Sequence, residues 1–260
     1  MENESLVRLG VFLGLFALFA LTEGLAPRRK RVQSRLRRWI TNLGLIVLDS
    51  LTIKLLPLLA VGAAYDASAN HWGIFHQLAW PAWVEVALAI AILDFAIWLQ
   101  HLMTHKIPLL WRFHRVHHTD RDFDVTTALR FHPVEIVFSM ILKIGLVYLL
   151  GPSVLAVILF EIILNGTAMF NHANLRLPLG LDRAVRLILV TPDMHRVHHS
   201  VYRAEHDSNY GFSLSIWDRL FHTYVAQPQD GHENMKIGLS WQDNRPANLG
   251  WVLMLPFFRK

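Results

Sequence analysis

The sequence predicts an all-α, integral-membrane helical bundle of about four to five spans, with a cytoplasmic helical cap that carries histidine motifs. Three observations lead to this fold class. The chain is 53% hydrophobic, and its apolar residues form long runs rather than short periodic stretches. Its 15 histidines concentrate in a few short motifs near the ends of these runs. Its basic residues concentrate in one segment between two apolar runs, as in a loop beside a membrane surface.

The first apolar run covers residues 7–21. Acidic residues precede this run and the basic cluster follows it, so we interpret it as a membrane span with its N-terminus outside rather than as a cleaved signal peptide. Seven of the 25 Lys and Arg residues then fall within residues 28–38. By the positive-inside rule this segment lies in the cytoplasm beside anionic headgroups. Its place between two apolar runs argues against a nucleic-acid partner.

Four further apolar runs approach or reach the length that crosses about 30 Å of hydrocarbon; they cover residues 40–64, 82–99, 134–150 and 154–170. With the basic segment inside, residues 66–81 lie outside; they lack Lys and Arg and carry Trp72 and Trp80. The fourth and fifth runs then go out and back, which places everything after residue 170 in the cytoplasm. The polar, aromatic sequence that follows predicts a cap over the inner ends of the spans.

This reading divides the chain into three parts. The first contains the N-terminal spans and the basic loop, the second contains the histidine motifs, and the third is a C-terminal tail. We expect their limits to be 1–93, 94–224 and 225–260.

The chain has no cysteine. That excludes disulfides, thiolate-bound zinc, iron–sulfur clusters and cysteine nucleophiles. Any metal ion is therefore held by imidazole, carboxylate or carbonyl groups.

Three histidine motifs carry the chemistry. They are HLMTH at 101–105, HRVHH at 114–118 and the same pentapeptide again at 195–199. Residues three or four apart share a helix face, so each motif can direct at least two imidazoles to one point. Eight imidazoles exceed the three or four protein ligands of a zinc site, which predicts two metal ions. A ninth candidate, His172, falls at the same expected depth, at the inner end of the fifth span.

Several polar residues near these motifs suggest further roles. Ionisable groups inside spans usually face a bundle interior or a functional site. We expect Asp94 and Glu161 to accept hydrogen bonds from the outer nitrogens of metal-bound imidazoles, with Asn165 on the same stripe as Glu161. The alternative is that both carboxylates pair with polar neighbours in the bundle. The sequence leaves three roles open for His132: a metal ligand, a hydrogen-bond partner of a ligand, or a residue at the start of a helix.

The other histidines have weaker sequence contexts. His206, within EHDSNYG at 205–211, is open in the same way as His132. Lone histidines are more often packed or exposed residues than ligands, and we assign that role to His71, His76, His222 and His232.

At these motifs the sequence resembles the fatty acid hydroxylase and sterol desaturase superfamily of membrane di-iron oxygenases. The resemblance rests on HLMTH, HRVHH, FNHAN at 170–174 and the second HRVHH, followed by DSNYGFSLSIWDRLF, and it covers residues 94–224. It implies two iron ions (Fe2+/Fe3+), with O2 as co-substrate. It also implies a set of nine ligands: His101, His105, His114, His117, His118, His172, His195, His198 and His199.

One feature departs from the family pattern. Many members have several histidines in the third motif, whereas here His172 stands there alone, so water or Asn165 could complete one iron site. Within the superfamily, FHP at 131–133 resembles the sterol-acting branch, and the overall arrangement resembles the alkylglycerol monooxygenase branch.

The resulting hypothesis is hydroxylation or desaturation of a lipid such as a fatty acyl chain, a sterol or an ether lipid. Electrons come from an external donor, cytochrome b5-like or a ferredoxin with its reductase, because the chain has neither cysteine nor a Gly-x-Gly-x-x-Gly motif. Imidazole sites bind zinc more tightly than ferrous iron, so purified protein can carry zinc. The membrane is the plasma or inner membrane if the source is bacterial.

Three alternatives use similar residues. A zinc-dependent membrane hydrolase is disfavoured because the chain lacks His-Glu-x-x-His and has too many histidines for one zinc ion. A metal transporter would place its ligands near mid-membrane rather than at the inner boundary. A bis-histidine haem protein would need far fewer histidines.

Overall fold

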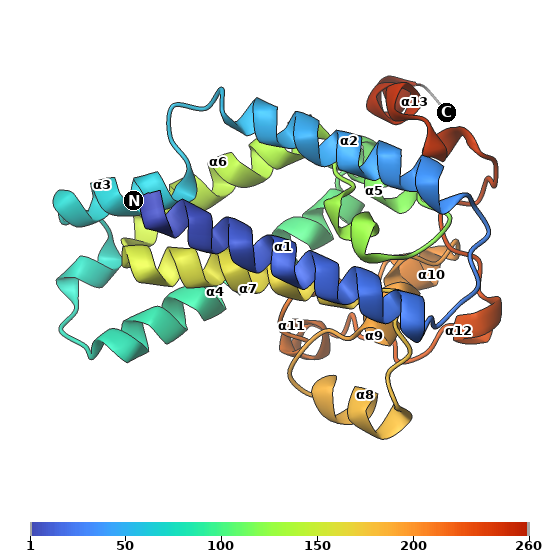
Figure 1. Ribbon diagram of the computed structural model, residues 1–260. Helices are drawn as coiled ribbons and strands as arrows, with labels where there is room; N and C mark the ends of the chain where they lie inside the picture. Colours follow the sequence, from blue (N-terminus) through green and yellow to red (C-terminus); the bar gives the residue numbers. More distant parts are fainter. Residues whose placement is uncertain (1, 259–260) are drawn as a thin grey trace.

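Long helices form a bundle, and short helices close one end of it (Figure 1). The computed structural model describes residues 2–258, and this part of the chain contains helices and three isolated β-bridges but no extended strand. Four helices are long and apolar enough to cross a membrane, which confirms the predicted fold class. They are α1 (Glu2–Leu25), α4 (Ala82–Lys106), α6 (Pro133–Leu150) and α7 (Val154–His172).

The apolar surface of α1 indicates that lipid surrounds the bundle. Leu6 and Leu21 are each 68% exposed and Leu13 is 53% exposed, although α1 packs along α7. Soluble monomers rarely expose contiguous apolar surface of this extent. The protein is therefore an integral-membrane protein.

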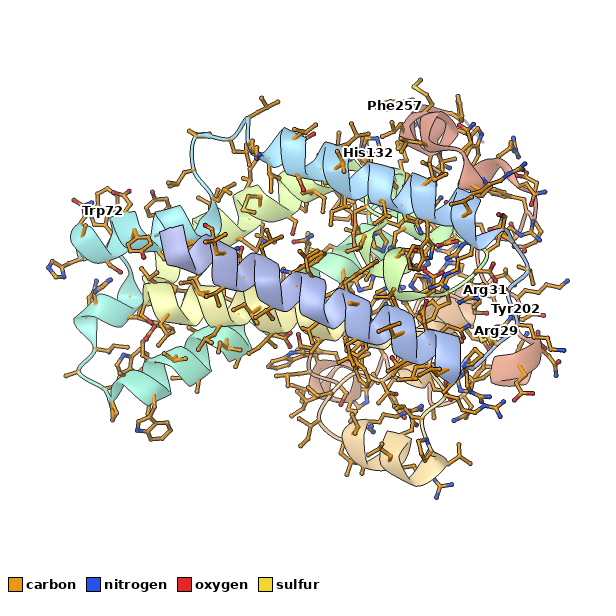
Figure 2. The ribbon with its side chains drawn as sticks, viewed as in Figure 1. Arg29, Arg31, Trp72, His132, Tyr202 and Phe257 are labelled. Atoms are coloured by element: carbon orange, nitrogen blue, oxygen red, sulfur yellow. The ribbon has the colours of Figure 1, made fainter. Side chains whose placement is uncertain are left out.

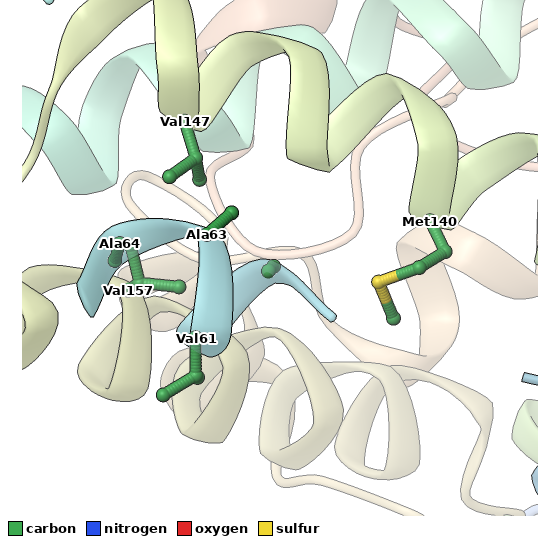
Figure 3. Close-up of a cluster of buried hydrophobic side chains, with 7 residues drawn as sticks. Val61, Ala63, Ala64, Met140, Val147 and Val157 are labelled. Carbon is green, nitrogen blue, oxygen red and sulfur yellow. The ribbon is translucent and has the colours of Figure 1, made fainter. Parts of the chain in front are cut away.

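The second apolar run is not one continuous helix, contrary to our expectation for residues 40–64. Helix α2 (Arg35–Ile53) ends before Pro57, and α3 (Ala60–Ala69) starts a new helix after the break. Proline disfavours helical backbone at the residue before it and cannot donate to the helix ladder. Helix α3 instead packs between α6 and α7, where Ala63 and Ala64 contact Val147 and Val157 (Figure 3).

Glycine makes the turn between α6 and α7. Gly151 caps α6 with φ +65°, in the left-handed region where a side chain is disfavoured. A Cβ at this position would lie 2.2 Å from the carbonyl oxygen of Trp72, so the close approach also requires glycine. Ser153 then accepts a hydrogen bond from the backbone of Ala156 and starts α7.

The remaining elements gather at the end of the bundle where α4 and α7 finish (Figure 1). They include α5 (Pro108–His118), α8 (Leu179–Val185), α9 (Pro192–His198), α10 (Arg203–His206), α11 (Ile216–Leu220), α12 (Gly231–Asn234) and α13 (Leu249–Met254), with the short 3-10 turns η2 (Val125–Leu129), η3 (Arg245–Ala247) and η4 (Leu255–Phe257). A further 3-10 turn, η1 (Ile74–Gln77), lies at the opposite end near α3. We call residues 173–258 the cap.

The basic segment and the tryptophan-bearing loop lie at opposite ends of the bundle, as predicted. Figure 2 shows Trp72 at one end and Arg29 and Arg31 at the other. The Arg29 guanidinium donates to the carbonyl oxygens of His232 (2.6 Å) and Met235 (2.5 Å). The C-terminal part of the chain therefore contacts the basic segment.

Candidate metal centre

Four helix ends bring nine histidines to one place beneath the cap. His101 and His105 lie on the last turns of α4, and His172 ends α7. Pro108 follows the end of α4 and occupies the first turn of α5, where its missing N–H costs nothing. Helix α5 carries the first HRVHH motif. Pro192 likewise occupies the first turn of α9, which carries the second motif, and the Thr191 hydroxyl accepts a hydrogen bond from the Met194 backbone N–H.

The histidines form two groups, in each of which one ligand atom per residue lies within 4.8 Å of the others. The five-histidine group contains His101, His105, His114, His118 and His198. The four-histidine group contains His117, His172, His195 and His199. Together they are the nine residues that the resemblance implied, and none is more than 8% exposed.

Adjacent histidines in the HRVHH motifs contribute to different groups. His117 belongs to the four-histidine group and His118 to the five-histidine group, and the same division separates His199 from His198. Successive helical residues point about 100° apart, so a pair of neighbours can face two separate points. The repeated pentapeptide therefore bridges two centres.

The imidazoles fit metal ions better than they fit one another. Nε2 of His101 lies 3.1 Å from Nε2 of His114, and Nε2 of His172 lies 3.2 Å from Nε2 of His117. Both ring nitrogens of His118 are buried without a hydrogen-bond partner among the described residues. The same holds for His105, His195 and His199. Buried polar atoms usually have a partner, and a metal ion supplies one for several imidazoles at once.

Burial keeps these histidines in the neutral form that binds metals. It lowers the pKa of His114 to about 3, and it lowers the pKa values of His117 and His118 well below the usual value. The pKa values of the three histidines in the second HRVHH motif fall in the same way. Neutral imidazole offers the lone pair that coordination needs.

The outer nitrogens of four histidines contact backbone carbonyls. Nδ1 of His101 lies 2.7 Å from the Tyr210 carbonyl oxygen, and Nδ1 of His198 lies 2.6 Å from that of Ser208. His117 and His172 make the same contact, at 3.2 and 2.8 Å, with the carbonyls of residues 130 and 168. Each contact assigns the proton to Nδ1 and leaves Nε2 free for a metal ion.

Glu135 is the carboxylate partner of the site. Its Oε1 lies 2.6 Å from Nδ1 of His114, and its side chain is buried. Sequence reasoning missed this residue because it lies on α6, outside the histidine motifs. Its position in the first turn after His132-Pro133, at the depth of the inner helix ends, was the available signal.

The expectation that Asp94 and Glu161 support imidazoles was wrong. Asp94 accepts from the Trp217 indole (2.9 Å) and the Leu214 backbone (3.2 Å), and so holds the cap to α4. Glu161 pairs with Arg8 and with Lys143 (3.4 Å). Both carboxylates lie too far up their helices from the histidines, and the alternative of pairing with polar neighbours is the one observed.

The three open residues take separate positions. Asn165 donates its amide to the Glu161 carbonyl (2.7 Å), and its side chain lines a cavity. His132 caps α6 by accepting from the Val134 backbone (3.2 Å), which is the helix-entry alternative. His206 stacks on Trp111, with ring centroids 5.6 Å apart, and can form a further three-residue group with His105 and Asp207.

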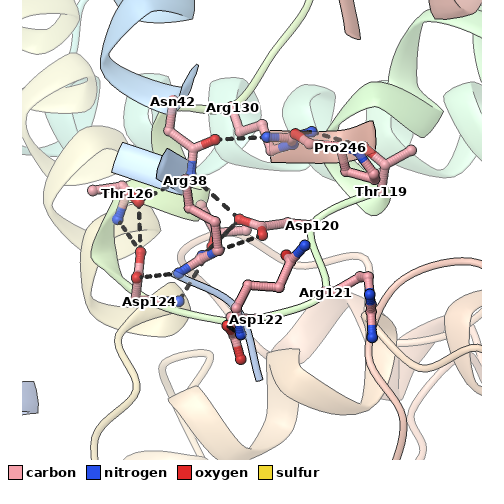
Figure 4. A network of polar contacts seen from close by, with 12 residues as sticks. Arg38, Asn42, Thr119, Asp120, Arg121, Asp122, Asp124, Thr126, Arg130 and Pro246 are labelled. Carbon is pink, nitrogen blue, oxygen red and sulfur yellow. Dashed lines mark hydrogen bonds and ion pairs between the residues drawn. The ribbon is translucent and has the colours of Figure 1, made fainter. Parts of the chain in front are cut away.

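A buried arginine network holds the segment that follows α5 (Figure 4). Arg38, on α2, binds both oxygens of Asp120 (2.6 and 2.7 Å) and one oxygen of Asp124 (2.6 Å). Burial alone would raise the pKa of Asp120, but the Arg38 guanidinium lowers it to about 2. Arg130 donates to the Val116 carbonyl (2.9 Å) and joins α5 to α2 and the C-terminal segment. These contacts fix α5 and therefore three histidines.

A cavity of about 320 Å³ opens beside the five-histidine group. His101 and His114 form part of its wall, and the remaining wall comes from α1, α2, α4, α6 and α7, from η2 and from Phe131 and Phe212. Apolar side chains such as Ile97, Phe131 and Phe212 line it together with several ionisable ones. The volume falls at the lower end of the range of about 300–1,000 Å³ that is typical of ligand pockets.

Comparison with known proteins places these motifs in a family context. Residues 86–223, which include all nine histidines, match the family model described as fatty acid hydroxylase. The chain is 29% identical to the ornithine lipid hydroxylase of Rhizobium tropici, over 87% of this chain and 70% of the relative. It is 35% identical to the alkylglycerol monooxygenase of Homo sapiens, over 61% of this chain and 33% of the relative. No solved structure matches.

Proposed function

Since the chain belongs to the fatty acid hydroxylase family, we propose that it is a membrane-bound di-iron oxygenase that hydroxylates, or desaturates, a lipid. The observation that carries the proposal is the gathering of nine buried histidines into two adjacent groups. Relatives described as a lipid hydroxylase and as monooxygenases support an oxygen-dependent oxidoreductase acting on a lipid. They disfavour the hydrolase and transporter alternatives.

The donor sets support two metal ions held by the nine histidines. Five and four neutral imidazoles exceed the ligands of a three- or four-coordinate zinc site. Imidazole suits iron, zinc, copper and nickel alike, so iron rests on the family's oxygenase chemistry. Iron bound there would supply the oxygen activation and C–H cleavage that hydroxylation needs.

The protein's own residues orient the imidazoles and exclude water. Backbone carbonyls and Glu135 hold the outer nitrogens of five of the nine rings, so these five present Nε2 without a rearrangement. The cavity beside His101 and His114 brings a lipid C–H bond to the centre, and its apolar side chains keep bulk water away. Glu161 and Asn165 contribute to this substrate cavity rather than to the metal centre.

Inserting one oxygen atom of O2 into a C–H bond releases the other as water and consumes two electrons and two protons. We assign these electrons to an external donor that reaches the five-histidine group through Trp111 and His206. The Trp111 ring lies 4.9 Å from the His105 ring and 5.4 Å from the His118 ring, and both Trp111 and His206 are partly exposed. Exposed Lys106 and Arg203 nearby suit an acidic redox protein.

The cytoplasmic side is the side that best fits the cap. The basic segment at residues 28–38 packs against the cap through Arg28 and Asp193 (3.2 Å), so both lie on the same face of the membrane. The positive-inside rule assigns that face to the cytoplasm.

Metal analysis and oxidation spectroscopy of anaerobically purified protein test the proposal. We expect close to two irons per chain, oxidised by O2. A His117→Ala/His198→Ala double variant removes one imidazole from each group and should lose both signals. A matched His222→Ala variant changes an exposed histidine outside both groups and should keep them. One tightly held zinc under iron-replete growth, without oxygen reactivity, would contradict the proposal.

A further inference from the structure

The cavity beside the five-histidine group is acidic on its metal side. Asp49, on α2, is only 6% exposed, and its Oδ1 has no hydrogen-bond partner among the described residues. Glu135 is 7% exposed, and its Oε2 is likewise without a partner, because only Oε1 contacts His114. Both carboxylates line the cavity. A buried carboxylate without a counter-charge or hydrogen-bond donor is costly, so this wall is incomplete as it stands.

A third buried acceptor in the same wall also lacks a hydrogen-bond donor. Gln100, one residue before His101, is 9% exposed, lines the cavity, and leaves its Oε1 without a partner among the described residues. All three orphan atoms are oxygens, and two of them belong to carboxylates. A ligand that donates hydrogen bonds would satisfy all three, and a positively charged donor matches the two carboxylates best.

The cations that also line the cavity are engaged elsewhere. Arg8 pairs with Glu161 and with Glu4 (3.4 Å), and Lys143 pairs with Glu161 (3.4 Å). Glu161 therefore holds both cations on the α1–α7 side of the cavity, and neither is paired with Asp49 or Glu135.

We propose that this cavity binds the head group of an amino-lipid, with its protonated amine held by Asp49, Glu135 and Gln100. The inference rests on the proposed function and specifies its substrate class. A bare hydrocarbon tail would leave the three acceptors buried and unpaired, whereas an amine with its N–H donors satisfies them. The alkyl part then lies along Ile53 and Met140.

The position of the amine determines where the lipid is oxidised. Glu135 contacts His114 directly, so an amine on its free oxygen lies one side chain away from the five-histidine group. The C–H bond nearest the metal centre is then in the head group or on the first carbons beyond it. Oxidation near the far end of the tail does not fit this arrangement.

Two lipids with the same chain, one with a free amine and one with a neutral acetamide, test the proposal. Sphingosine carries a free amine, and N-acetylsphingosine keeps the same chain and hydroxyls without the charge. Binding of each to the iron-loaded full chain is measured by titration calorimetry in a neutral detergent at about pH 6.5, where a simple amine is protonated. We expect sphingosine to bind at least about tenfold more tightly, the scale of one charge-assisted hydrogen bond.

Variants separate the acidic wall from general effects. Asp49→Asn keeps the shape of the side chain and should remove most of the preference for sphingosine, whereas Asp49→Glu should retain it. Asp230→Asn changes an exposed carboxylate outside the cavity and should have no effect. Iron content and the melting temperature, measured in parallel, show whether each variant is folded.

Equal binding of the two lipids to the unchanged protein, or an undiminished preference in Asp49→Asn, would overturn the proposal and indicate that Lys143 serves as the internal counter-ion. A new oxygen found by fragmentation mass spectrometry near the tail end of a turned-over amino-lipid would also overturn it. If two irons are still bound, any of these results leaves the oxygenase assignment intact. If the unchanged protein binds no iron, the oxygenase assignment itself is contradicted.

Discussion

Replacing Glu135 with glutamine tests the carboxylate that contacts the His114 imidazole. Glu135 Oε1 lies 2.6 Å from His114 Nδ1 in a buried setting, so its charge fixes the tautomer of His114 and raises the basicity of Nε2. Glutamine keeps the shape but not the charge. We expect the iron affinity of the five-histidine group to fall by about 10–100-fold, the usual effect of losing such a partner. That range corresponds to about 1.4–2.7 kcal/mol.

The assay is a competition between the protein and a chelator of known affinity, read as bound iron at each chelator concentration. A biphasic curve is expected, because the four-histidine group keeps its own partners. Glu161→Gln serves as the matched control, since Glu161 is also a buried carboxylate in a membrane helix but pairs with Arg8 and Lys143. Equal losses in the two variants would refute the assignment of Glu135.

Three further predictions concern stability and metal dependence. Arg38→Met leaves Asp120 and Asp124 buried without their cation and should lower the free energy of unfolding by about 3–5 kcal/mol, measured by denaturant titration in detergent; exposed Arg37→Met should change it little. Gly151→Ala should cost about 1–3 kcal/mol through its left-handed φ and its contact with the Trp72 carbonyl, and an unchanged melting curve would contradict this. Removing metal with a chelator should lower the melting temperature, and ferrous iron should restore it, because ions bound only by the folded state stabilise it.

The histidine motifs were predictable from the sequence because their chemistry is local. A repeated HRVHH and a histidine pair at the end of a span already require several imidazoles at one depth. How the nine divide into five and four was not predictable. His117 and His118 are neighbours in sequence but face different centres, and that depends on how α5 is rotated against α9. Rotation about a helix axis is set by packing partners such as Arg38 and Arg130, which are distant in sequence.

The polar residues within the spans show where sequence reasoning failed. Glu161 lies eleven residues before His172, and at 1.5 Å per residue that places it about 16 Å along α7 from the centre. A shared helix face guarantees direction but not proximity, so the cations of α1 and α6 became its partners. The long apolar runs, by contrast, predicted four spans correctly, and the prediction failed for the second run, at Pro57, where the proline should have had more weight.

Support from backbone carbonyls makes the metal centre depend on the shape of the cap. The hydrogen bonds to His198 and His101 come from the backbone carbonyls of Ser208 and Tyr210, so they depend on the course of the backbone rather than on the polar groups of these two side chains. The Asp218 carboxylate fixes this course by accepting from the backbone N–H groups of Tyr210 (2.8 Å) and Gly211 (2.9 Å).

A substitution that touches no ligand should therefore weaken metal binding. A Cβ on Gly211 would lie 2.8 Å from Cγ2 of Val190, 2.9 Å from the Leu214 carbonyl oxygen and 3.0 Å from an Asp218 oxygen, so Gly211→Ala must displace the segment. We expect the five-histidine group, whose members include both supported histidines, to lose iron affinity in the chelator competition, while the four-histidine group keeps its affinity. Gly180→Ala, where a Cβ meets nothing within 4 Å, is the control. If Gly211→Ala retains full affinity, the carbonyls follow the imidazoles rather than position them.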